Sequence, residues 1–536
     1  MNIFRPGFVF LTILTAGYAA VAAPANAAPA SRPNVLLIVA DDLGFSDIGP
    51  YGGEISTPNL DRLASEGMRF TQFYNCAVCV MTRAALYSGL FPRPGKGGLL
   101  RNNTVTLGEA LRPAGYFTVL TGKWHLGSEA PHRPIDRGFD EYYGVLSGCC
   151  DYFSPAKPDP YFYNDGGNRR IFAHNDQLIT EFPADYYTTN AFSDHAADMI
   201  RRAAKSNRPF FINLCYTAPH FPLHALAEDV ARQRGKYRDG YDKLRARRFQ
   251  RQIELGIVNP AVTKLSNIDP KTGTYRYEYQ TKSWDQLDQA SRQREEERME
   301  VYAAMVDRLD QGIGRVLSAL AETGLAKNTV IFFLSDNGGC TRWSENNAKE
   351  MAGFIEYNRG VPVGDGRGYE FVGPSWGWAQ NAPFRHAKTW TYEGGLCTPM
   401  IVRWPGVVKA GAITHQQGHV IDFLPTLLQL ANRPYPEKNN GEKTPALEGR
   451  SLIPILRGGT AEPHQVPLAW ELYGNRAIRD GDWKLVWGAS DRRWELYNLA
   501  TDRSETTDLS GKYPDRSTKM AAGWEQWAKR TGVVIK

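Results

Sequence analysis

Several short apolar runs, rich in β-branched and aromatic residues, end in polar turns that contain glycine. They lie at Asn34–Ala40, Tyr116–Leu120, Phe210–Leu214, Val330–Leu334 and Met400–Val402. Continuous apolarity is typical of strands that are buried on both faces, as in a parallel sheet covered by helices. These runs therefore predict the strands of one large central sheet.

Helical patterns alternate with these runs. Apolar positions from Leu60 to Met68 follow a Thr-Pro start, and Thr106 stands three residues before Glu109, as in a capping box. From Tyr302 to Leu320 apolar residues recur near every 3.6 positions, which predicts a long helix before the fourth strand. The alternation predicts an α/β fold, with a large, doubly wound, mixed sheet flanked by helices.

The pattern changes near the C-terminus. From Leu468 onward, short alternating runs are joined by a turn at Asp480–Asp482, which predicts a small antiparallel sheet. Residues Pro514–Arg530 have the pattern of a closing helix. With 536 residues, the chain is long enough for a large domain, predicted at 28–460, and a C-terminal subdomain at 461–536.

A polar helical insertion is expected at about 225–298. Within it, the stretch from Arg232 to Arg251 carries nine Lys and Arg residues against two Asp. Such a stretch is either a solvated helical face or a patch that attracts an anionic polymer. The chain's net charge of +6 is small for its length, and no aromatic interleaving or known binding motif accompanies the charge, which excludes nucleic acid as a partner.

The first residues have the pattern of a secretory signal. Arg5 precedes an apolar run from Phe8 to Ala23, and small residues follow it. We expect residues 1–27 to be a signal peptide, and the protein to be exported to a bacterial periplasm or secreted. No later segment reaches roughly eighteen uninterrupted apolar residues, so we expect no stable membrane insertion.

Reactive side chains follow three of the predicted strands. The first strand leads into Asp41 and Asp42, the fourth into Asp336 and Asn337, and the third into Tyr216–His220. Ligands of open parallel sheets bind beyond the carboxyl ends of the strands. The four carboxylate and amide side chains offer hard oxygen ligands, which calcium and magnesium prefer.

The segment between the first and fourth predicted strands carries a specific motif. Cys79 stands four residues before Arg83, and an Ala-Ala-Leu-Tyr-Ser-Gly helix follows. With Thr121–Gly127, Ala218–His220 and Lys388 ahead of Tyr-Glu-Gly-Gly, this order of motifs resembles the sulfatase family. The resemblance is to arylsulfatase-like, formylglycine-dependent members of the alkaline phosphatase superfamily, and it extends from about residue 33 to 509.

The resemblance implies a specific chemistry. In sulfatases, a formylglycine-generating enzyme oxidises the signature cysteine to formylglycine, whose aldehyde hydrates to a geminal diol. One hydroxyl attacks sulfur beside a calcium ion and displaces the alcohol, and the second then expels sulfate. By this resemblance, the chain hydrolyses a sulfate monoester to an alcohol or phenol and inorganic sulfate.

The resemblance also implies the site residues. The ligands of one Ca²⁺ would be Asp41, Asp42, Cys79, Asp336 and Asn337.

The remaining roles surround the modified cysteine. Arg83 would steady the diol, and Lys123 and Lys388 would hold the sulfate oxygens. His125 would act as a base during expulsion of sulfate, and His220 would protonate the leaving oxygen.

One residue departs from the family pattern. The signature is normally Cys-x-Pro-x-Arg, and Met81 stands where proline is expected. An unconverted Cys79 would leave a non-catalytic binder of sulfate esters, and a phosphate or phosphonate ester hydrolase of the same superfamily is a further alternative.

The identity of the substrate stays open in the sequence. A sulfated small molecule and a sulfated carbohydrate both suit the motifs. Trp376, Trp378 and Trp390 lie near Lys388 in the sequence and would serve either as an aromatic lining of the entrance or as core packing.

Overall fold

A mixed sheet forms the centre of the fold, in a computed structural model that describes residues 1, 32–92, 99–161, 169–266, 282–341 and 348–533. Within these residues it has eleven strands, in the order β10-β2-β9-β8-β1-β7-β3-β4-β5-β6, with β11 also paired to β2. The strands are β1 (Asn34–Ala40), β2 (Met68–Tyr74), β3 (Phe117–Gly122), β4 (Glu141–Val145), β5 (Phe172–His174), β6 (Gln177–Leu178), β7 (Phe210–Cys215), β8 (Thr329–Ser335), β9 (Cys397–Arg403), β10 (Ala412–Thr414) and β11 (Gly418–His419).

The five predicted strands are all present, as β1, β3, β7, β8 and β9. The central strands β8, β1, β7, β3 and β4 are parallel, whereas β9 runs antiparallel to both β8 and β2. Every residue of β1, β7 and β8 is buried, because helices cover both faces of the sheet. The predicted mixed, doubly wound sheet is confirmed.

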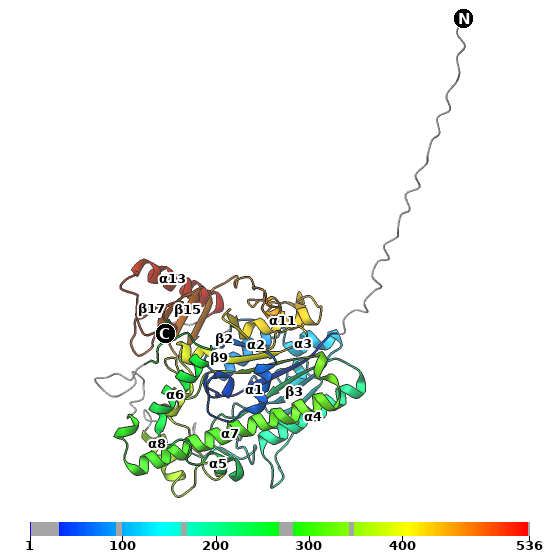
Figure 1. The fold of residues 1–536 in the computed structure, drawn as a ribbon. Helices are drawn as coiled ribbons and strands as arrows, with labels where there is room; N and C mark the ends of the chain where they lie inside the picture. Colours follow the sequence, from blue (N-terminus) through cyan, green and yellow to red (C-terminus); the bar gives the residue numbers. More distant parts are fainter. Residues whose placement is uncertain (2–31, 93–98, 162–168, 267–281, 342–347, 534–536) are drawn as a thin grey trace. The chain divides into compact units, whose positions relative to one another are not determined.

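Helices pack on both sides of this sheet (Figure 1). In the figure, α4 and α7 lie together on one side, and α2, α3 and α11 lie on the other. The described helices are α1 (Pro58–Ser65), α2 (Cys79–Ser88), α3 (Leu107–Leu111), α4 (Thr188–Ser206), α5 (Ala227–Gln233), α6 (Gly240–Glu254), α7 (Gln289–Glu322), α8 (Ala348–Tyr357), α9 (Pro374–Gln380), α10 (Glu393–Leu396), α11 (Phe423–Leu430), α12 (Ile453–Leu456) and α13 (Pro514–Thr531), with short 3-10 turns between some of them.

Two local predictions can be checked atom by atom. The Thr106 hydroxyl accepts a hydrogen bond from the Glu109 backbone N–H at 3.2 Å, and the Glu109 carboxylate accepts one from the Thr106 N–H at 2.8 Å, which confirms the capping box. The long helix α7 begins thirteen residues before the expected Tyr302, at Gln289, because the Asp288 side chain caps its polar first turn.

A second, four-stranded antiparallel sheet follows near the C-terminus. It consists of β14 (Leu468–Leu472), β15 (Asn475–Asp480), β16 (Trp483–Trp487) and β17 (Trp494–Asn498), and α13 packs against it. The fully buried Trp524 of α13 donates its indole N–H to the carbonyl of Trp470 at 2.9 Å. The predicted small sheet and closing helix are confirmed. A short two-stranded ribbon, β12 (Lys438–Asn439) with β13 (Glu442–Lys443), completes the strands.

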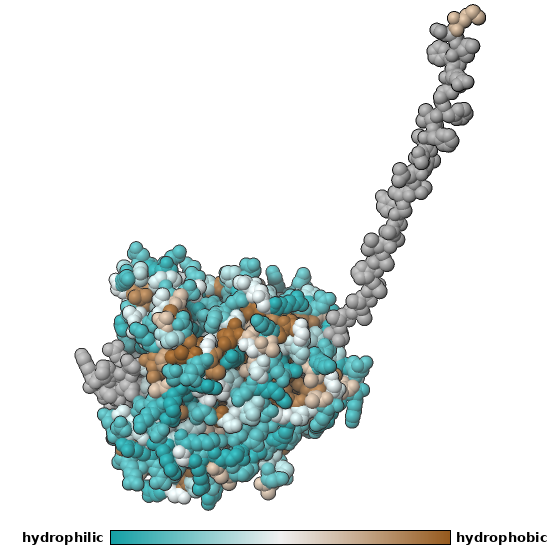
Figure 2. Space-filling model, in the orientation of Figure 1, coloured by the Kyte–Doolittle hydropathy of each residue, from teal (hydrophilic) through white to brown (hydrophobic). Residues whose placement is uncertain are grey.

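Residues Pro33–Lys536 form one compact unit that contains both sheets, whereas the predicted boundary at residue 460 stays a prediction. The predicted signal peptide lies outside the described residues, Met1 excepted. Within the described part of the chain, every helix is too short or too polar to cross a membrane. The face drawn in Figure 2 is mostly hydrophilic, with hydrophobic residues gathered in a band between α11 and α7, where the sheet lies in Figure 1.

Seven of the nine basic residues in the basic stretch of the insertion are exposed, as expected of a solvated face, and two are buried. Arg245 and Arg248 in α6 are both 1% exposed. Arg248 donates to the carboxylates of Asp47 and Glu54, at distances between 2.7 and 2.8 Å. Part of the positive charge therefore anchors α6 to the large domain through buried ion pairs.

The three tryptophans near Lys388 are core residues. Trp376, Trp378 and Trp390 are 0%, 4% and 5% exposed. Trp376 packs edge-on against Tyr237, and Trp390 stacks on His386 at 4.3 Å between ring centroids. Of the two interpretations left open, the structure favours packing.

Candidate active site

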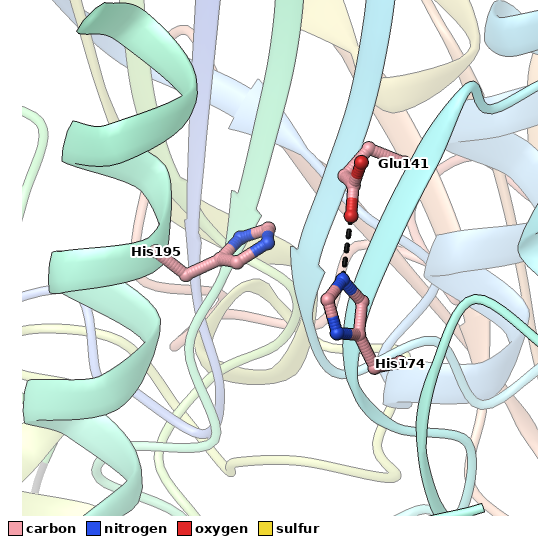
Figure 3. Close-up of side chains that lie close together, drawn as sticks. All are labelled: Glu141, His174 and His195. Atoms are coloured by element: carbon pink, nitrogen blue, oxygen red, sulfur yellow. Dashed lines mark hydrogen bonds and ion pairs between the residues drawn. The ribbon is translucent and has the colours of Figure 1, made fainter. Parts of the chain in front are cut away.

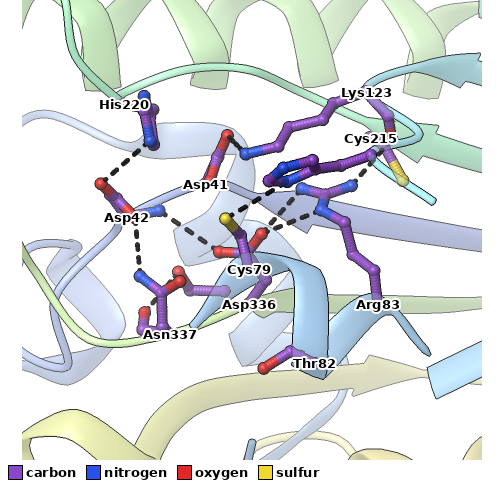
Figure 4. A network of polar contacts seen from close by, with 12 residues as sticks. Asp41, Asp42, Cys79, Thr82, Arg83, Lys123, Cys215, His220, Asp336 and Asn337 are labelled. Carbon is purple, nitrogen blue, oxygen red and sulfur yellow. Dashed lines mark hydrogen bonds and ion pairs between the residues drawn. The ribbon is translucent and has the colours of Figure 1, made fainter. Parts of the chain in front are cut away.

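The two acidic corners, Asp41–Asp42 after β1 and Asp336–Asn337 after β8, meet beyond the carboxyl ends of these central strands. Strands β1 and β8 are parallel neighbours with Ala40 opposite Ser335, so the residues after each strand leave the sheet side by side. The Asn337 amide donates a hydrogen bond to Asp42 Oδ1 at 2.7 Å, and the Ser335 hydroxyl accepts one from the Leu43 N–H at 3.0 Å. Figure 4 shows the side chains of both corners converging.

Cys79 lies directly against this acidic cluster. It is the first residue of α2, is 5% exposed and carries an unpaired thiol. Ligand atoms of Asp41, Cys79 and Asp336 all lie within 4.8 Å of one another (Figure 4). The start of α2 thus brings the signature cysteine close to the carboxylates that the resemblance assigned to the same site.

Arg83 anchors the signature helix to the second corner. Its side chain, 2% exposed, donates to Asp336 Oδ2 from Nε at 3.1 Å and from Nη2 at 2.8 Å. A third bond, from Nη1, reaches the carbonyl of Lys123 at 2.8 Å. Arg83 therefore neutralises one carboxylate and holds the loop after β3 against α2.

Each of the two lysines pairs with one carboxylate of the first corner. Lys123 Nζ lies 2.6 Å from Asp41 Oδ2, and Lys388 Nζ lies 2.6 Å from Asp42 Oδ1. Burial opposes charge on both ammonium groups, but the neighbouring carboxylates outweigh it and raise both lysine pKa values. Both lysines are therefore cationic and face the cluster.

The carboxylates respond differently to burial. Desolvation raises the pKa of Asp41 and, together with the charge of Asp41, raises that of Asp336 to about 6. Burial also disfavours the charged form of Asp42, but His220 and Lys388 outweigh it and hold its pKa well below the ordinary range. Asp42 is thus the carboxylate of the cluster that ionises most readily.

Three buried oxygens of the cluster have no hydrogen-bond donor among the described residues. They are Asp41 Oδ1, Asp42 Oδ2 and Asn337 Oδ1. Unpartnered buried oxygens are costly unless another group completes them. Together with Asp336, they form a set of hard oxygen donors that fits a divalent cation such as calcium.

Two histidines border the cluster on different sides. His125 Nδ1 lies 3.5 Å from Cys79 Sγ. His220 turns Nε2 towards Asp42 Oδ2, at 3.6 Å, while its Nδ1–H donates to the carbonyl of Phe221 at 2.6 Å. Burial lowers the pKa of His125 well below the ordinary value and that of His220 to about 3, so the neutral rings are favoured.

The backbone is strained at two of these residues. Asp42 and His125 have φ values of +65° and +64°, in the left-handed region that side chains other than glycine rarely adopt. Such strain persists where surrounding contacts over-determine the conformation, which is common at functional sites.

Sequence reasoning missed residues that position this cluster. The Tyr302 hydroxyl on α7 donates to Asp47 Oδ2 at 2.7 Å and lies 3.3 Å from the carbonyl oxygen of Asp42. The Thr389 N–H donates to the carbonyl of Ala77 at 2.7 Å, which ties the Lys388 loop to the cysteine loop. Tyr302 gave no separate signal, because it occupies an ordinary apolar position of a helical pattern.

Comparison with known proteins identifies the family. The Sulfatase family model matches residues 33–433, which is more than half of the chain. The chain belongs to the sulfatase family. A second model, the C-terminal region of N-sulphoglucosamine sulphohydrolase, matches residues 384–522 of this sulfatase. The resemblance inferred from the motifs is confirmed, and the protein is a sulfuric ester hydrolase.

Relatives and solved structures extend the match over nearly all of the sulfatase. It is 34% identical to an uncharacterised sulfatase of Schizosaccharomyces pombe, over 95% of each chain. It is 32% identical to an arylsulfatase of Klebsiella aerogenes, over 77% of this chain and 89% of the relative. The crystal structure of Ps i-CgsB with k-i-k-neocarrahexaose has a TM-score of 0.66 and 27% identity, with 93% of each chain covered.

Every predicted site residue of this sulfatase lies in or beside the one cluster. The structure brings together Cys79, Arg83, both lysines, both histidines and the four oxygen-bearing residues, although they come from six separate segments. Sulfatases depend on a metal, and the acidic cluster supplies groups that could hold one.

Proposed function

We propose that this sulfatase hydrolyses a sulfate monoester of a carbohydrate, using one calcium ion and a formylglycine made from Cys79. The observation that carries the proposal is the position of Cys79, with its ligand atom within 4.8 Å of those of Asp41 and Asp336. A cation and a modified side chain at that point would share one small, buried space between two lysines.

The residues that would hold calcium are Asp41, Asp42, Asp336 and Asn337, with the side chain at position 79 beside them. The support is the three unpartnered oxygens, which a hard cation would complete. A bound calcium ion would supply a Lewis acid and a template for the nucleophile and the sulfate group.

The modification requires oxidation of Cys79 by a formylglycine-generating enzyme, with dioxygen as the oxidant. Formylglycine would supply a hydrated aldehyde, with one hydroxyl as the nucleophile for sulfur and a second for the release of sulfate. His125, at 3.5 Å from Cys79 Sγ and favoured as the neutral ring, is placed to accept the proton released during expulsion.

The two lysines and His220 act on the substrate. Lys123 and Lys388 are cationic and would hold the sulfate oxygens as negative charge moves in the transition state. His220 would protonate the leaving oxygen through Nε2, because its Nδ1–H is committed to Phe221. A bound anion would raise the pKa of this histidine towards the range in which it can donate.

A sulfated carbohydrate is proposed as substrate on the strength of the relatives. A relative whose match covers 94% of this chain is named N-acetylgalactosamine-6-sulfatase. The Ps i-CgsB structure contains a neocarrahexaose. The predicted signal would export the enzyme to the periplasm or beyond, where such polymers are met.

The experiment is peptide mass spectrometry of the Cys79 peptide, followed by assays on matched esters. Conversion replaces sulfur and two hydrogens by one oxygen and lowers the peptide mass by about 18 Da. The converted enzyme should release sulfate from sulfated oligosaccharides and lose activity on calcium removal, with recovery on calcium addition. A wholly unconverted thiol would contradict the mechanism, and faster hydrolysis of an aryl phosphate than of the matched aryl sulfate would contradict the reaction.

A further inference from the structure

A second group of ligand-type side chains lies apart from the catalytic cluster and shares no residue with it. Glu141 on β4, His174 on β5 and His195 on α4 each offer a ligand atom, and these atoms lie within 4.8 Å of one another. Figure 3 shows the imidazole of His195 directed from α4 towards the pair formed by Glu141 and His174.

The His195 imidazole is placed to direct a nitrogen lone pair into this group. His195 Nδ1 lies 2.8 Å from the hydroxyl of Thr121, whereas the buried Nε2 has no hydrogen-bond partner among the described residues. With Nδ1–H donating to Thr121, Nε2 is the basic nitrogen. Burial lowers the pKa of His195 to about 4, so the ring is neutral at pH 7 and able to bind a metal.

The other two side chains are arranged as ligands with supports. Glu141 Oε1 lies 2.6 Å from His174 Nε2, and Glu141 Oε2 accepts a hydrogen bond from Arg202 at 2.8 Å. Glu141 is largely buried, whereas the His174 side chain is 47% exposed. The group is thus open to solvent on one side, and each inner ligand is oriented by a further hydrogen bond, as in protein metal sites.

We propose that Glu141, His174 and His195 form a binding site for a divalent transition metal, with zinc as the expected ion. Two imidazoles and one carboxylate form a ligand set typical of zinc with an open fourth position. Calcium is disfavoured, because it binds oxygen ligands rather than imidazole nitrogen. The metal-free alternative is an ion pair between His174, when protonated, and Glu141.

The bound ion would join three elements at the edge of the large sheet. Strands β5 and β6 have only three and two residues and are held by few backbone hydrogen bonds. A metal bridging β4, β5 and α4 would add a link that these short strands lack. We therefore expect zinc to stabilise the folded protein by mass action.

The test is a zinc titration of the full-length enzyme, stripped with a chelator and then held in excess calcium. Calorimetry should show that wild type binds one zinc ion more than His174→Gln and Glu141→Gln. Zinc should raise the melting temperature of wild type but not that of these two variants. With cobalt in place of zinc, wild type should give an absorption spectrum that indicates imidazole nitrogen ligation. His195→Gln should lack this spectrum. Thr121→Val should weaken zinc binding by about 10- to 100-fold, because it removes the hydrogen bond that orients His195.

The controls separate this site from others. His415→Gln removes an exposed histidine that contacts Thr71 and should bind zinc as wild type does. Because His174 is half-exposed, its variant should fold and keep sulfatase activity in calcium. Equal zinc stoichiometry and equal thermal shifts in wild type and His174→Gln would overturn the proposal, whatever zinc does at the catalytic cluster.

Discussion

Lys388 Nζ lies 2.6 Å from Asp42 Oδ1, although 346 positions separate the two residues in the chain. The loop that carries Lys388 is held by the C-terminal sheet. The Asn475 amide donates to the carbonyl of Thr389 at 3.2 Å, and the Thr391 hydroxyl donates to the carbonyl of Arg476 at 3.1 Å. The small sheet therefore contributes to the candidate active site by positioning one of its two lysines.

Replacing Lys388 should affect catalysis far more than folding. Lys388→Ala removes a cation proposed to stabilise charge in the transition state, and we expect kcat/KM to fall by about 100- to 1,000-fold. Steady-state kinetics on a sulfate ester, with a melting curve, will measure this. Lys409→Ala, at an exposed position, is the matched control. A variant within threefold of wild type would show that Lys388 does not act on the substrate.

Met81→Pro should increase conversion of Cys79 without loss of stability. Met81 is the third residue of α2 and lies in its first turn, where the backbone N–H has no partner within the helix, so proline costs little there. Proline also restores the signature that the maturation enzyme normally reads. Mass spectrometry of the two proteins, expressed side by side with the maturation enzyme, will give the converted fraction. Equal fractions would show that Met81 does not limit maturation.

The effect of His220→Ala should depend on the leaving group. A proton donor matters most when the departing oxygen is basic. We expect a loss of about 100-fold or more for an alkyl or sugar sulfate and a much smaller loss for 4-nitrophenyl sulfate. The ratio of kcat/KM values for the two esters is the readout. Equal losses on both esters would assign His220 to binding and not to proton transfer.

Lys484→Met should destabilise the junction between the two sheets. The Lys484 ammonium is fully buried and lies 2.8 Å from both Glu393 Oε1 and Glu505 Oε1. Methionine fills the space but leaves two buried carboxylates without this cation, for which we expect a loss of about 3 kcal/mol in unfolding free energy. Denaturant unfolding measures the change, and Lys519→Met, at an exposed position of α13, is the control. If Lys484→Met were as stable as wild type, Lys484 would not stabilise the junction between the two sheets.

Asp310 should give stability a specific pH dependence. Its carboxylate is buried where α7 meets α1, accepts hydrogen bonds from the Asn59 and Leu60 N–H groups, and has its pKa raised by burial to about 6. A raised carboxyl pKa favours the protonated form on folding, so this contribution is present below about pH 4 and is lost as the pH rises through about 6.

The Asp310→Asn variant isolates that contribution. Asparagine does not titrate, so the stability of the variant relative to wild type should improve between pH 4 and pH 7, by up to about 3 kcal/mol. Denaturant unfolding of both proteins across this range provides the measurement. A stability difference that is constant with pH would show that Asp310 is not the titrating group.

Short-range patterns predicted the elements, and the resemblance of the motifs to the sulfatase family implied the residues of the candidate site. The strand before Asp41 and the capping box at Thr106 depend on neighbouring residues, and so do the motif around Cys79 and the turn at Asp480–Asp482. Burial of a strand and capping of a helix are decided over a few positions, which is why a single sequence displays them. The parallel pairing of β1 with β8 then followed from the fold class.

Only the tertiary structure decided which distant groups meet. The burial of Arg248 against Asp47, the packing of Trp376 in the core and the grouping of Glu141 with His174 and His195 left no pattern in the sequence. The physical reason is that a buried charge or a free imidazole nitrogen acquires its energy from partners brought up by other strands and helices. Those partners are specified by the packing of the whole chain, whereas the strand, helix and turn that carry each residue are specified locally.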